Sequence, residues 1–434
     1  MRYIANLLIV TDNDQSELCP ALSKAGYLCD YISFSKMLEG NVGEETFDLL
    51  IIDSEHNATN VDIEHIAGFA DLNGFPILII GETDVQCHAS TLSPGYCDLE
   101  LLSRVSSLVR LENMQQELNR RVVSTETYGI DLSGLEKPDD DISDTHLLII
   151  GNKSLILGNI LLRLDCRAKI QISKDPDTAI SELRNQEFDA VILSGTGHGD
   201  RNLRLANEIR SDSRFYNLPM IMVLENVENR EAAYIHGVSD IVLHETEMDS
   251  LINRTTVQIL QYRYRSAMQK LFRVTKPHPL ADGPTDIYSF GFMKTHLPKM
   301  MAEHDQRKKT MSVASLKISN LEKINSVHGF ASGDQLLRQI GSAIFYLVRG
   351  EDFCGRYEKG HFVVALPGTR EKEANIALQR LVGVIRNTEF SLKGVTSPVK
   401  VELVFGLAEA KPDETLEENL DRGFLHKQKD EQAA

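Results

Sequence analysis

NLLIVTDND (residues 6–14) and HLLIIGNKS (146–154) are two versions of one segment, and this repeat decides the fold. Two further pairs keep the spacing: FDLLIID (47–53) with FDAVILS (188–194), and FPILIIG (75–81) with LPMIMVL (218–224). The offsets of 140, 141 and 143 residues indicate an internal repeat of one domain. Each run is short and apolar, as in parallel strands buried on both faces, and helical patterns lie between the runs. The repeat therefore predicts two successive α/β domains, each a doubly wound parallel sheet.

Length and composition indicate a folded protein of several domains. The chain has 434 residues, 42% hydrophobic and 25% charged, and roughly 150 residues per domain gives about three domains. With 46 Lys+Arg against 63 Asp+Glu, the net charge of −17 argues against a nucleic-acid binder but allows one local arginine site for a small anion. No stretch approaches the roughly 20 apolar residues of a membrane helix, and no signal peptide is recognisable. We therefore expect a cytoplasmic protein whose six cysteines are reduced.

Changes of pattern along the chain indicate the domain boundaries. We expect a first domain over 1–123, a polar linker over 124–144, a second domain over 145–273 and a third domain over 284–430.

Two long helices and a different third domain complete the expected architecture. The helices are expected at about 99–123 and 248–273, and they either pair in a dimer or pack on their own sheets. Strands at 313–319, 361–367 and 401–410, with helices between them, predict an α+β third domain with a mixed sheet.

In an open α/β sheet, functional residues gather at the carboxyl ends of the strands. In the first domain these ends carry Asp12, Asp14 and Asp53. Clustered carboxylates can bind Mg²⁺, which prefers oxygen ligands and neutralises an incoming phosphoryl group. The pattern resembles a receiver domain of the CheY-like, flavodoxin-like fold. This resemblance implies that Asp53 is a phosphoacceptor and that Asp12 and Asp53 hold Mg²⁺.

The first domain departs from the receiver pattern at three positions. Thr11 stands where the first of two adjacent acids is usual, and Gly81 stands where a Thr or Ser switch residue ends strand four. No Lys-Pro follows the fifth strand, which we expect near 95–102. Asp53 could instead serve as a helix or turn cap, and this alternative stays open.

The second domain keeps the strand pattern and loses the acids. Gly151 and Asn152 replace the acids after its first strand, and Ser194 occupies the position of Asp53. The glycine-rich loop at 195–199 lacks the Lys-Ser/Thr of a phosphate-binding loop, so we expect a simple turn there. We therefore expect an adaptor domain without a phosphoacceptor.

The third domain carries short motifs in a fixed order. They are DGPTDIYSFGFM (282–293), Asn325 with Gly329, Gly333-Asp334, and Arg356-Tyr357 followed by Phe362. With two receiver-like domains before them, these motifs resemble PleD-type response regulators, in which two receivers precede a GGDEF domain of diguanylate cyclases. The resemblance covers nearly the whole chain and implies a homodimer. Active members join two GTP molecules with carboxylate-bound metal.

The positions that would contact metal and triphosphate differ from that family. The GGDEF signature reads Glu358-Lys359-Gly360-His361-Phe362, and Lys317 stands at the other metal-binding acid. A lysine in place of an acid changes the local charge by two units and repels the cation. The substrate-binding segment reads Ser289-Phe290-Gly291, and KQKDEQAA (427–434) replaces the basic phosphate grip. We therefore expect no enzymatic activity.

One ligand motif of the family remains. Arg349-Gly350-Glu351-Asp352 is an R-x-x-D at the position where relatives bind cyclic di-GMP as an intercalated dimer. An arginine fork can reach guanine O6 and N7 or phosphate, and a carboxylate can accept from the guanine N1–H and N2–H₂ edge. The resemblance also implies secondary contacts from Arg380 and Arg167. The alternative is a chance motif with a surface ion pair of little energetic value.

Ligand binding without catalysis predicts a cyclic di-GMP effector. Within the PleD-type family the chain most resembles the PopA-like members. This implies recruitment to the cell pole, delivery of cell-cycle regulators to a ClpXP-type protease through protein adaptors, and a histidine kinase or phosphotransfer protein upstream. Two alternatives stay open: a phosphorylation-driven scaffold without nucleotide binding, favoured by Asp53, and a residual GTP-binding allosteric domain.

Overall fold

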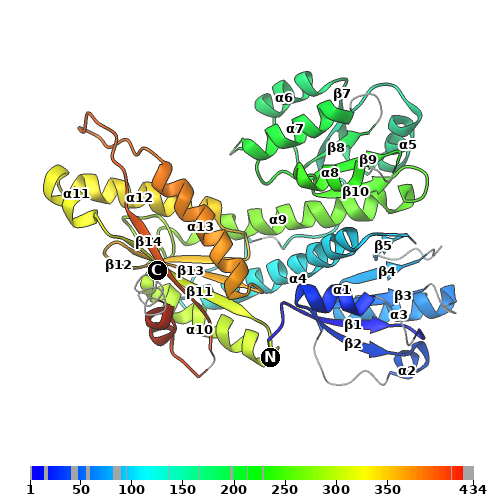
Figure 1. Cartoon of the computed structure of the whole chain (residues 1–434), viewed down its shortest axis with the longest axis horizontal. Coiled ribbons are helices and arrows are strands. Elements are labelled where there is room, and N and C mark those ends of the chain that lie inside the picture. The colour runs from blue at the N-terminus through cyan, green and yellow to red at the C-terminus, as the bar shows by residue number, and fades with distance from the viewer. Residues whose placement is uncertain are drawn as a thin grey trace.

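The computed structural model describes residues 2–423, apart from 14–17, 41–46, 55–58, 82–88, 94, 136, 166, 196–198, 213, 227–228 and 412. It contains two parallel sheets followed by an antiparallel one, which confirms two doubly wound α/β domains before an α+β domain. In Figure 1 the parallel sheets lie on either side of two long helices, and the third domain lies at one end of this pair. No helix in the described part of the chain is long and apolar enough to cross a membrane.

The first domain is a five-stranded parallel sheet in the order β2-β1-β3-β4-β5. Its elements are β1 (Asn6–Val10), α1 (Leu18–Ala25), β2 (Leu28–Ile32), α2 (Phe34–Leu38), β3 (Leu49–Asp53), α3 (Asn60–Asn73), β4 (Ile77–Ile80), β5 (Ser90–Leu92) and α4 (Asp98–Glu126). The whole of β3 is buried, as its unbroken apolar run predicts. Because β1 and β3 are neighbours, the residues at their carboxyl ends meet at one edge of the sheet.

The second domain repeats this arrangement in the order β10-β9-β8-β6-β7. Its elements are β6 (His146–Ile150), α5 (Leu155–Leu164), β7 (Lys169–Ser173), α6 (Pro176–Asn185), β8 (Ala190–Ser194), α7 (Gly199–Ser211), β9 (Met220–Leu224), α8 (Arg230–Ile235), β10 (Asp240–Leu243) and α9 (Leu251–Thr275). Ser154 and Asp175 begin α5 and α6 by accepting backbone N–H groups that the first helical turn leaves unpaired.

The third domain has four strands in the order β12-β13-β11-β14, and all neighbouring strands are antiparallel. Its elements are α10 (Phe290–Gln306), β11 (Met311–Ile318), α11 (Leu321–His328), α12 (Phe330–Leu347), β12 (Phe353–Glu358), β13 (His361–Pro367), α13 (Glu371–Asn387) and β14 (Leu403–Glu409). The prediction of a mixed sheet was wrong, because the sequence pattern did not identify β12. FCGRYE has no long apolar run, yet it forms a hairpin with β13.

The long helices α4 and α9 lie side by side within one chain (Figure 1). Met114 and Leu118 of α4 join Met268 and Leu271 of α9 in one buried apolar cluster. These helices extend beyond their sheets, as the sequence suggested. Their apolar faces are covered inside the chain, so no second copy is needed to bury them.

Buried ion pairs connect the two parallel-sheet domains. Arg104 of α4 pairs with Asp240 of β10, and Arg230 of α8 pairs with Glu100 of α4. The Arg254 side chain on α9 also donates to the Thr91 carbonyl of β5, at 3.2 Å. Because a buried charge that loses its partner costs several kcal/mol, these pairs fix how the two domains pack together.

A buried lysine connects the first domain to the third. Lys309, which is 1% exposed, places Nζ 2.9 Å from Asp48 Oδ1 and 2.8 Å from Asn113 Oδ1. Beside it, the Tyr3 N–H donates to the Lys308 carbonyl at 3.0 Å, and the Tyr3 carbonyl accepts the N–H of residue 310 at 2.7 Å. The first domain is therefore docked at the start of β11.

Candidate functional site

Asp53 ends β3 at the carboxyl edge of the first sheet and is 5% exposed. Its Oδ2 accepts a hydrogen bond from the Thr11 hydroxyl at 3.1 Å. Asp12 Oδ1 accepts the Phe34 N–H at 3.1 Å, at the start of α2, whereas Asp14 lies outside the described residues. The described residues contain no cluster of three or more His, Cys, Asp or Glu suited to a metal. The carboxylates of Asp12 and Asp53 still offer the oxygen ligands that Mg²⁺ prefers, and they are the residues that would hold it.

The fifth strand lies earlier in the chain than the sequence indicated. Gly81 directly follows β4, as the sequence indicated, but β5 is Ser90–Leu92 and not a strand near 95–102. Ser93 therefore follows the fifth strand, and the 95–102 segment is a short turn followed by the first residues of α4. The strand escaped recognition because it is only three residues long and contains two hydroxyl side chains.

We expect acetyl phosphate to phosphorylate Asp53 and to leave Ser194 unmodified. Only Asp53 presents a carboxylate nucleophile at the end of the middle strand. Intact-mass measurement should show one added phosphoryl group in the wild type and in Ser194→Ala, and none in Asp53→Asn. A phosphoryl group retained by Asp53→Asn would contradict the assignment. Because Gly81 has no hydroxyl to bind the phosphoryl group, we expect little structural response.

In the second domain, tight packing fills the carboxyl edge of the sheet, which corresponds to the edge that holds Asp53 in the first domain. Ser194 ends β8 and is fully buried. A Cβ on Gly151, which follows β6, would lie only 2.6 Å from the Ser194 Cβ, so glycine is required there. The two residues thus occupy the space in which the first domain holds its acids. Residues 196–198 of the glycine-rich loop lie outside the described residues.

The β12–β13 hairpin of the third domain carries Glu358-Lys359-Gly360-His361. Lys359 has a left-handed φ of 35°, a conformation that costs roughly 1–2 kcal/mol for a residue with a side chain. Lys317 of β11 lies opposite His361 of β13 in the sheet. The pKa of His361 is lowered by burial and by the Lys317 charge. Two basic side chains therefore face each other where the family resemblance implies metal-binding acids.

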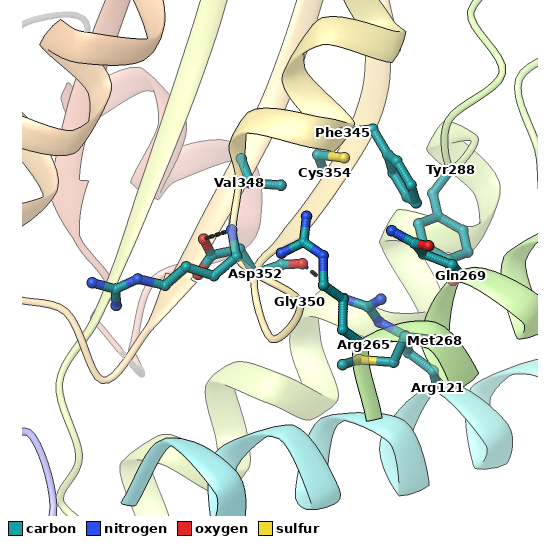
Figure 2. Close-up of a pocket in the computed structure, with 11 residues that line it drawn as sticks. Arg121, Arg265, Met268, Gln269, Tyr288, Phe345, Val348, Gly350, Asp352 and Cys354 are labelled. Atoms are coloured by element: carbon teal, nitrogen blue, oxygen red, sulfur yellow. Dashed lines mark hydrogen bonds between the residues drawn. The ribbon is translucent and has the colours of Figure 1, made fainter. Parts of the chain in front are cut away.

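The 349–352 loop connects α12 to β12 and rests on α4 and α9 (Figure 2). Arg349 is exposed, whereas Asp352 is 5% exposed and accepts the Arg349 N–H through Oδ2, at 2.8 Å. A Cβ on Gly350 would lie 3.0 Å from Met114 of α4 and 3.2 Å from Met268 of α9. The surface ion pair considered above is therefore not observed. Asp352 is buried, and it binds backbone.

Two arginines of α4 hold this loop from below. Arg110 Nε donates to Glu351 Oε1 at 3.0 Å, and Arg121 Nη2 donates to the Asp352 carbonyl at 2.7 Å. The cavity between the loop and the helices measures about 20 Å³, the room of about one water molecule. A dinucleotide cannot enter there, so the accessible side of the loop is the side of Arg349.

That side of the loop faces the first domain. Burial raises the pKa of the Tyr27 hydroxyl, and its hydrogen bond with Ser106 and the charge of Arg349 act in the opposite direction. Arg370, which precedes α13, donates to the Gly26 carbonyl at 3.3 Å. The turn between α1 and β2 therefore lies close enough to Arg349 for the Tyr27 hydroxyl to sense its charge.

The two secondary arginines lie apart from the loop pocket. Arg380 is exposed on α13 and does not line the pocket beneath the loop. Arg167 is exposed in the turn between α5 and β7, which Figure 1 places on the opposite side of the molecule from α12 and α13. The structure therefore does not bring Arg167 to the loop within one chain.

Residues 280–423 match the family model described as diguanylate cyclase, GGDEF domain. The last third of the chain is a GGDEF domain. Response regulator PleD of Caulobacter vibrioides is 23% identical over 313 residues, which cover 72% of this chain and 68% of PleD. That length exceeds the matched segment, so the similarity to PleD reaches into the parallel-sheet domains.

Two further similar proteins each match about a third of the chain. Diguanylate cyclase DosC of Escherichia coli K12 is 24% identical over 139 residues, which cover 32% of this chain and 29% of DosC. Among solved structures, the GGDEF domain of DgcB from Caulobacter crescentus in complex with c-di-GMP is 21% identical. It aligns with a TM-score of 0.33 and covers 34% of this chain and 85% of that chain.

A buried polar network that the sequence did not indicate joins the GGDEF domain to α4. His296 of α10 lies 3.0 Å through Nε2 from Glu117 Oε1 and 3.2 Å through Nδ1 from Ser124 Oγ. Glu117 also pairs with Arg120 and Arg121. Burial alone would raise the pKa of Glu117, but Arg121, His296 and Arg120 together lower it. Ser, His and Glu are connected as in a hydrolytic triad, yet each is at most 1% exposed, so this network is structural.

Asp352 is expected to make the stability of the GGDEF domain depend on pH. Burial and the Glu351 charge raise the pKa of Asp352 to about 7. Its contribution to stability is therefore complete below the unfolded pKa of 3.8 and is lost as the pH rises through about 7. We expect the stability of Asp352→Asn relative to the wild type to increase between about pH 4 and 7 and to stay constant above pH 7. The difference should grow by at most about 1.4 kcal/mol per pH unit.

Urea unfolding at several pH values measures this difference. Glu322→Gln, which removes an exposed acid of the same domain, serves as the control and should follow the wild type throughout. A constant difference between Asp352→Asn and the wild type from pH 5 to 8 would show that Asp352 keeps an ordinary pKa.

Proposed function

We propose that this chain is a catalytically inactive GGDEF-domain response regulator that acts as an effector of cyclic di-GMP. The 349–352 loop carries the proposal. It keeps the arginine and the carboxylate of an R-x-x-D motif while the neighbouring hairpin holds basic residues at the metal positions. The ligand would be recognised by the exposed Arg349 fork on guanine or phosphate, while the buried Asp352 holds the Arg349 backbone.

Loss of catalysis is supported by the charges around β11 and β13. Lys317 and His361 occupy facing register positions, and Lys359 takes the hairpin turn in which the family has glycine. A divalent cation needs oxygen ligands, and an ammonium beside its position opposes it. The segment that would bind substrate is also altered. Its Phe290 packs against Tyr357, with 5.1 Å between the two ring centroids.

Binding of cyclic di-GMP is supported by the geometry of the loop. Arg349 is exposed and free to approach a ligand, whereas Arg110 and Arg121 keep the backbone of the loop in place. A fixed loop reduces the entropy lost on binding. Because the ligand reaches the loop from the side of the α1–β2 turn, its occupancy would be sensed by the first domain, which carries Asp53.

The partners follow from the same proposal. A cyclic di-GMP effector without catalysis acts through other proteins, and the PopA-like resemblance suggests adaptors of a ClpXP-type protease, recruitment to the cell pole and a homodimer. A histidine kinase or phosphotransfer protein would supply the phosphoryl group of Asp53. Arg380 remains a candidate secondary contact, and Arg167 could contribute only from a second copy of the chain.

Arg349→Ala is expected to weaken cyclic di-GMP binding by about 5- to 150-fold, since one bidentate arginine contact contributes about 1–3 kcal/mol. Calorimetric titration of both proteins at one ionic strength measures this. Arg214→Ala removes an exposed arginine of the second domain and should bind like the wild type. Equal affinity of wild type and Arg349→Ala, or no binding by the wild type at tens of micromolar ligand, would favour the scaffold function. Tight binding of GTP alone would favour the residual GTP-binding domain.

A further inference from the structure

A pocket of about 220 Å³ lies where α4, α9 and the second domain meet. The ionisable residues that line it are Arg110, Arg210, Tyr216, Tyr262 and Arg265, and none of its described lining residues is acidic. The chain as a whole carries 63 Asp+Glu against 46 Lys+Arg. Three arginines against one neighbouring acid, Glu351, which pairs with Arg110, leave a local excess of positive charge that attracts an anion.

Arg265, on α9, has the weakest hydrogen bonds of these three arginines and no ion pair in the described residues. It is 9% exposed, and its hydrogen bond to a described residue runs from Nη2 to the Tyr346 carbonyl at 3.5 Å, the outer limit for such a bond. It forms no ion pair with any acid that the structure describes. Burial and the charge of Arg110 lower the pKa of Arg265, and the charges of Glu351 and Asp352 offset only part of this lowering. A buried guanidinium without a close counter-ion is costly, and an anion in the pocket would remove that cost.

The other two arginines differ in what they can offer a ligand. Arg110 uses Nε for Glu351, and its side chain is 38% exposed, so its terminal nitrogens remain available. Arg210 donates to the carbonyls of Tyr216, Leu218 and Gly237 at 2.7–2.9 Å and to a serine hydroxyl at 2.9 Å. Arg210 is therefore held in place and contributes positive charge, whereas Arg110 and Arg265 can donate.

We propose that this pocket binds a phosphate group, with Arg110 and Arg265 as the donors. Two guanidinium forks suit the tetrahedral oxygens of phosphate better than ammonium groups do. The volume admits a phosphate or a nucleoside monophosphate and is too small for a cyclic dinucleotide. Tyr216, which is 49% exposed, offers a ring on which the base of a mononucleotide can stack. The pocket adjoins the 349–352 loop, since Arg110 holds Glu351 and Arg265 also lines the cavity beneath the loop, but Arg349 is not among its lining residues.

Thermal unfolding of the full chain tests this proposal. At pH 7.5 and fixed ionic strength, replacing chloride by inorganic phosphate should raise the unfolding temperature of the wild type. Arg265→Met, which keeps much of the volume and removes the charge, should unfold at a higher temperature than the wild type in chloride and should not respond to phosphate. Arg110→Gln should need at least about tenfold more phosphate for the same shift. Arg349→Ala should respond like the wild type.

Titration with guanosine 5′-monophosphate distinguishes the two sources of the phosphate. Tighter binding than inorganic phosphate, lost in Tyr216→Ala, would identify a mononucleotide, and equal binding would identify the free anion. Three results would overturn the proposal: no response of the wild type up to about 20 mM phosphate, an equal response of Arg265→Met, or lower stability of Arg265→Met than of the wild type in chloride. Lower stability of Arg265→Met would show that other groups of the protein already balance the charge of Arg265.

Discussion

Glu117→Ala is expected to lower the free energy of unfolding by about 3–5 kcal/mol, because it removes one partner of a buried ionic network. Glu117 is 1% exposed and pairs with Arg121 at 2.6 Å, with His296 at 3.0 Å and with Arg120. Without the carboxylate, the buried Arg121 guanidinium keeps the Asp352 carbonyl and the Tyr288 side chain as partners but has no counter-ion among the described residues. Urea unfolding of both proteins at pH 7 measures the loss.

Glu126→Ala is the matched control, since Glu126 is an exposed acid of the same helix and should change stability by less than about 0.5 kcal/mol. The folded pKa of Glu117 is lowered, so its contribution is complete above the ordinary carboxyl pKa of 4.5 and is lost as the pH falls below it. The gap between wild type and Glu117→Ala should therefore narrow in acid. A loss below about 1 kcal/mol at pH 7 would mean that the network contributes specificity of packing and little stability.

Cyclic di-GMP synthesis from GTP, with Mg²⁺ or Mn²⁺, is expected to be about 10³-fold or more below that of an active diguanylate cyclase. Loss of a single transition-state contact already costs about 10²–10³ in rate, and here the metal positions carry Lys317 and His361. Product analysis by chromatography over several hours, beside an active cyclase, measures this rate.

Restoring acids at positions 317, 360 and 361 is expected to give no rescue. Ser289-Phe290-Gly291 still stands where the family binds substrate, and 427–434 carries no phosphate grip. The combined variant should first be shown to keep the unfolding midpoint of the parent. Turnover by the wild type at the rate of an active cyclase, or strong activity in the restored variant, would contradict an inactive domain.

The two parallel-sheet domains were predictable because their strands are unbroken apolar runs, and such runs form fully buried strands in almost any context. The strands that escaped recognition lack this signal. Ser90–Leu92 is three residues long, and Phe353–Glu358 contains a glycine, an arginine and a glutamate. Both are strands because a neighbour in the sheet supplies the hydrogen bonds, which a local pattern does not record.

The candidate site, too, was predictable from the sequence only in part. The 349–352 motif is contiguous, so its place in the chain was readable. The burial of the loop was not, because it comes from Arg121, Met114 and Met268 on helices far upstream in the sequence. The phosphate pocket was equally hidden, since Arg110 and Arg265 lie in different repeats. Contacts between repeats depend on how α4 and α9 pair, and neither helix carries that information alone.

The buried link between Asp48 and Lys309 has a consequence for synthesis. The two residues are 261 positions apart, which a ribosome adding about 5–20 residues per second needs roughly 10–50 s to cover. During that interval the first domain displays a hydrated carboxylate where the finished protein holds a dry ion pair. The docking face of the nascent first domain therefore stays exposed to water until Lys309 has been synthesised and has left the exit tunnel.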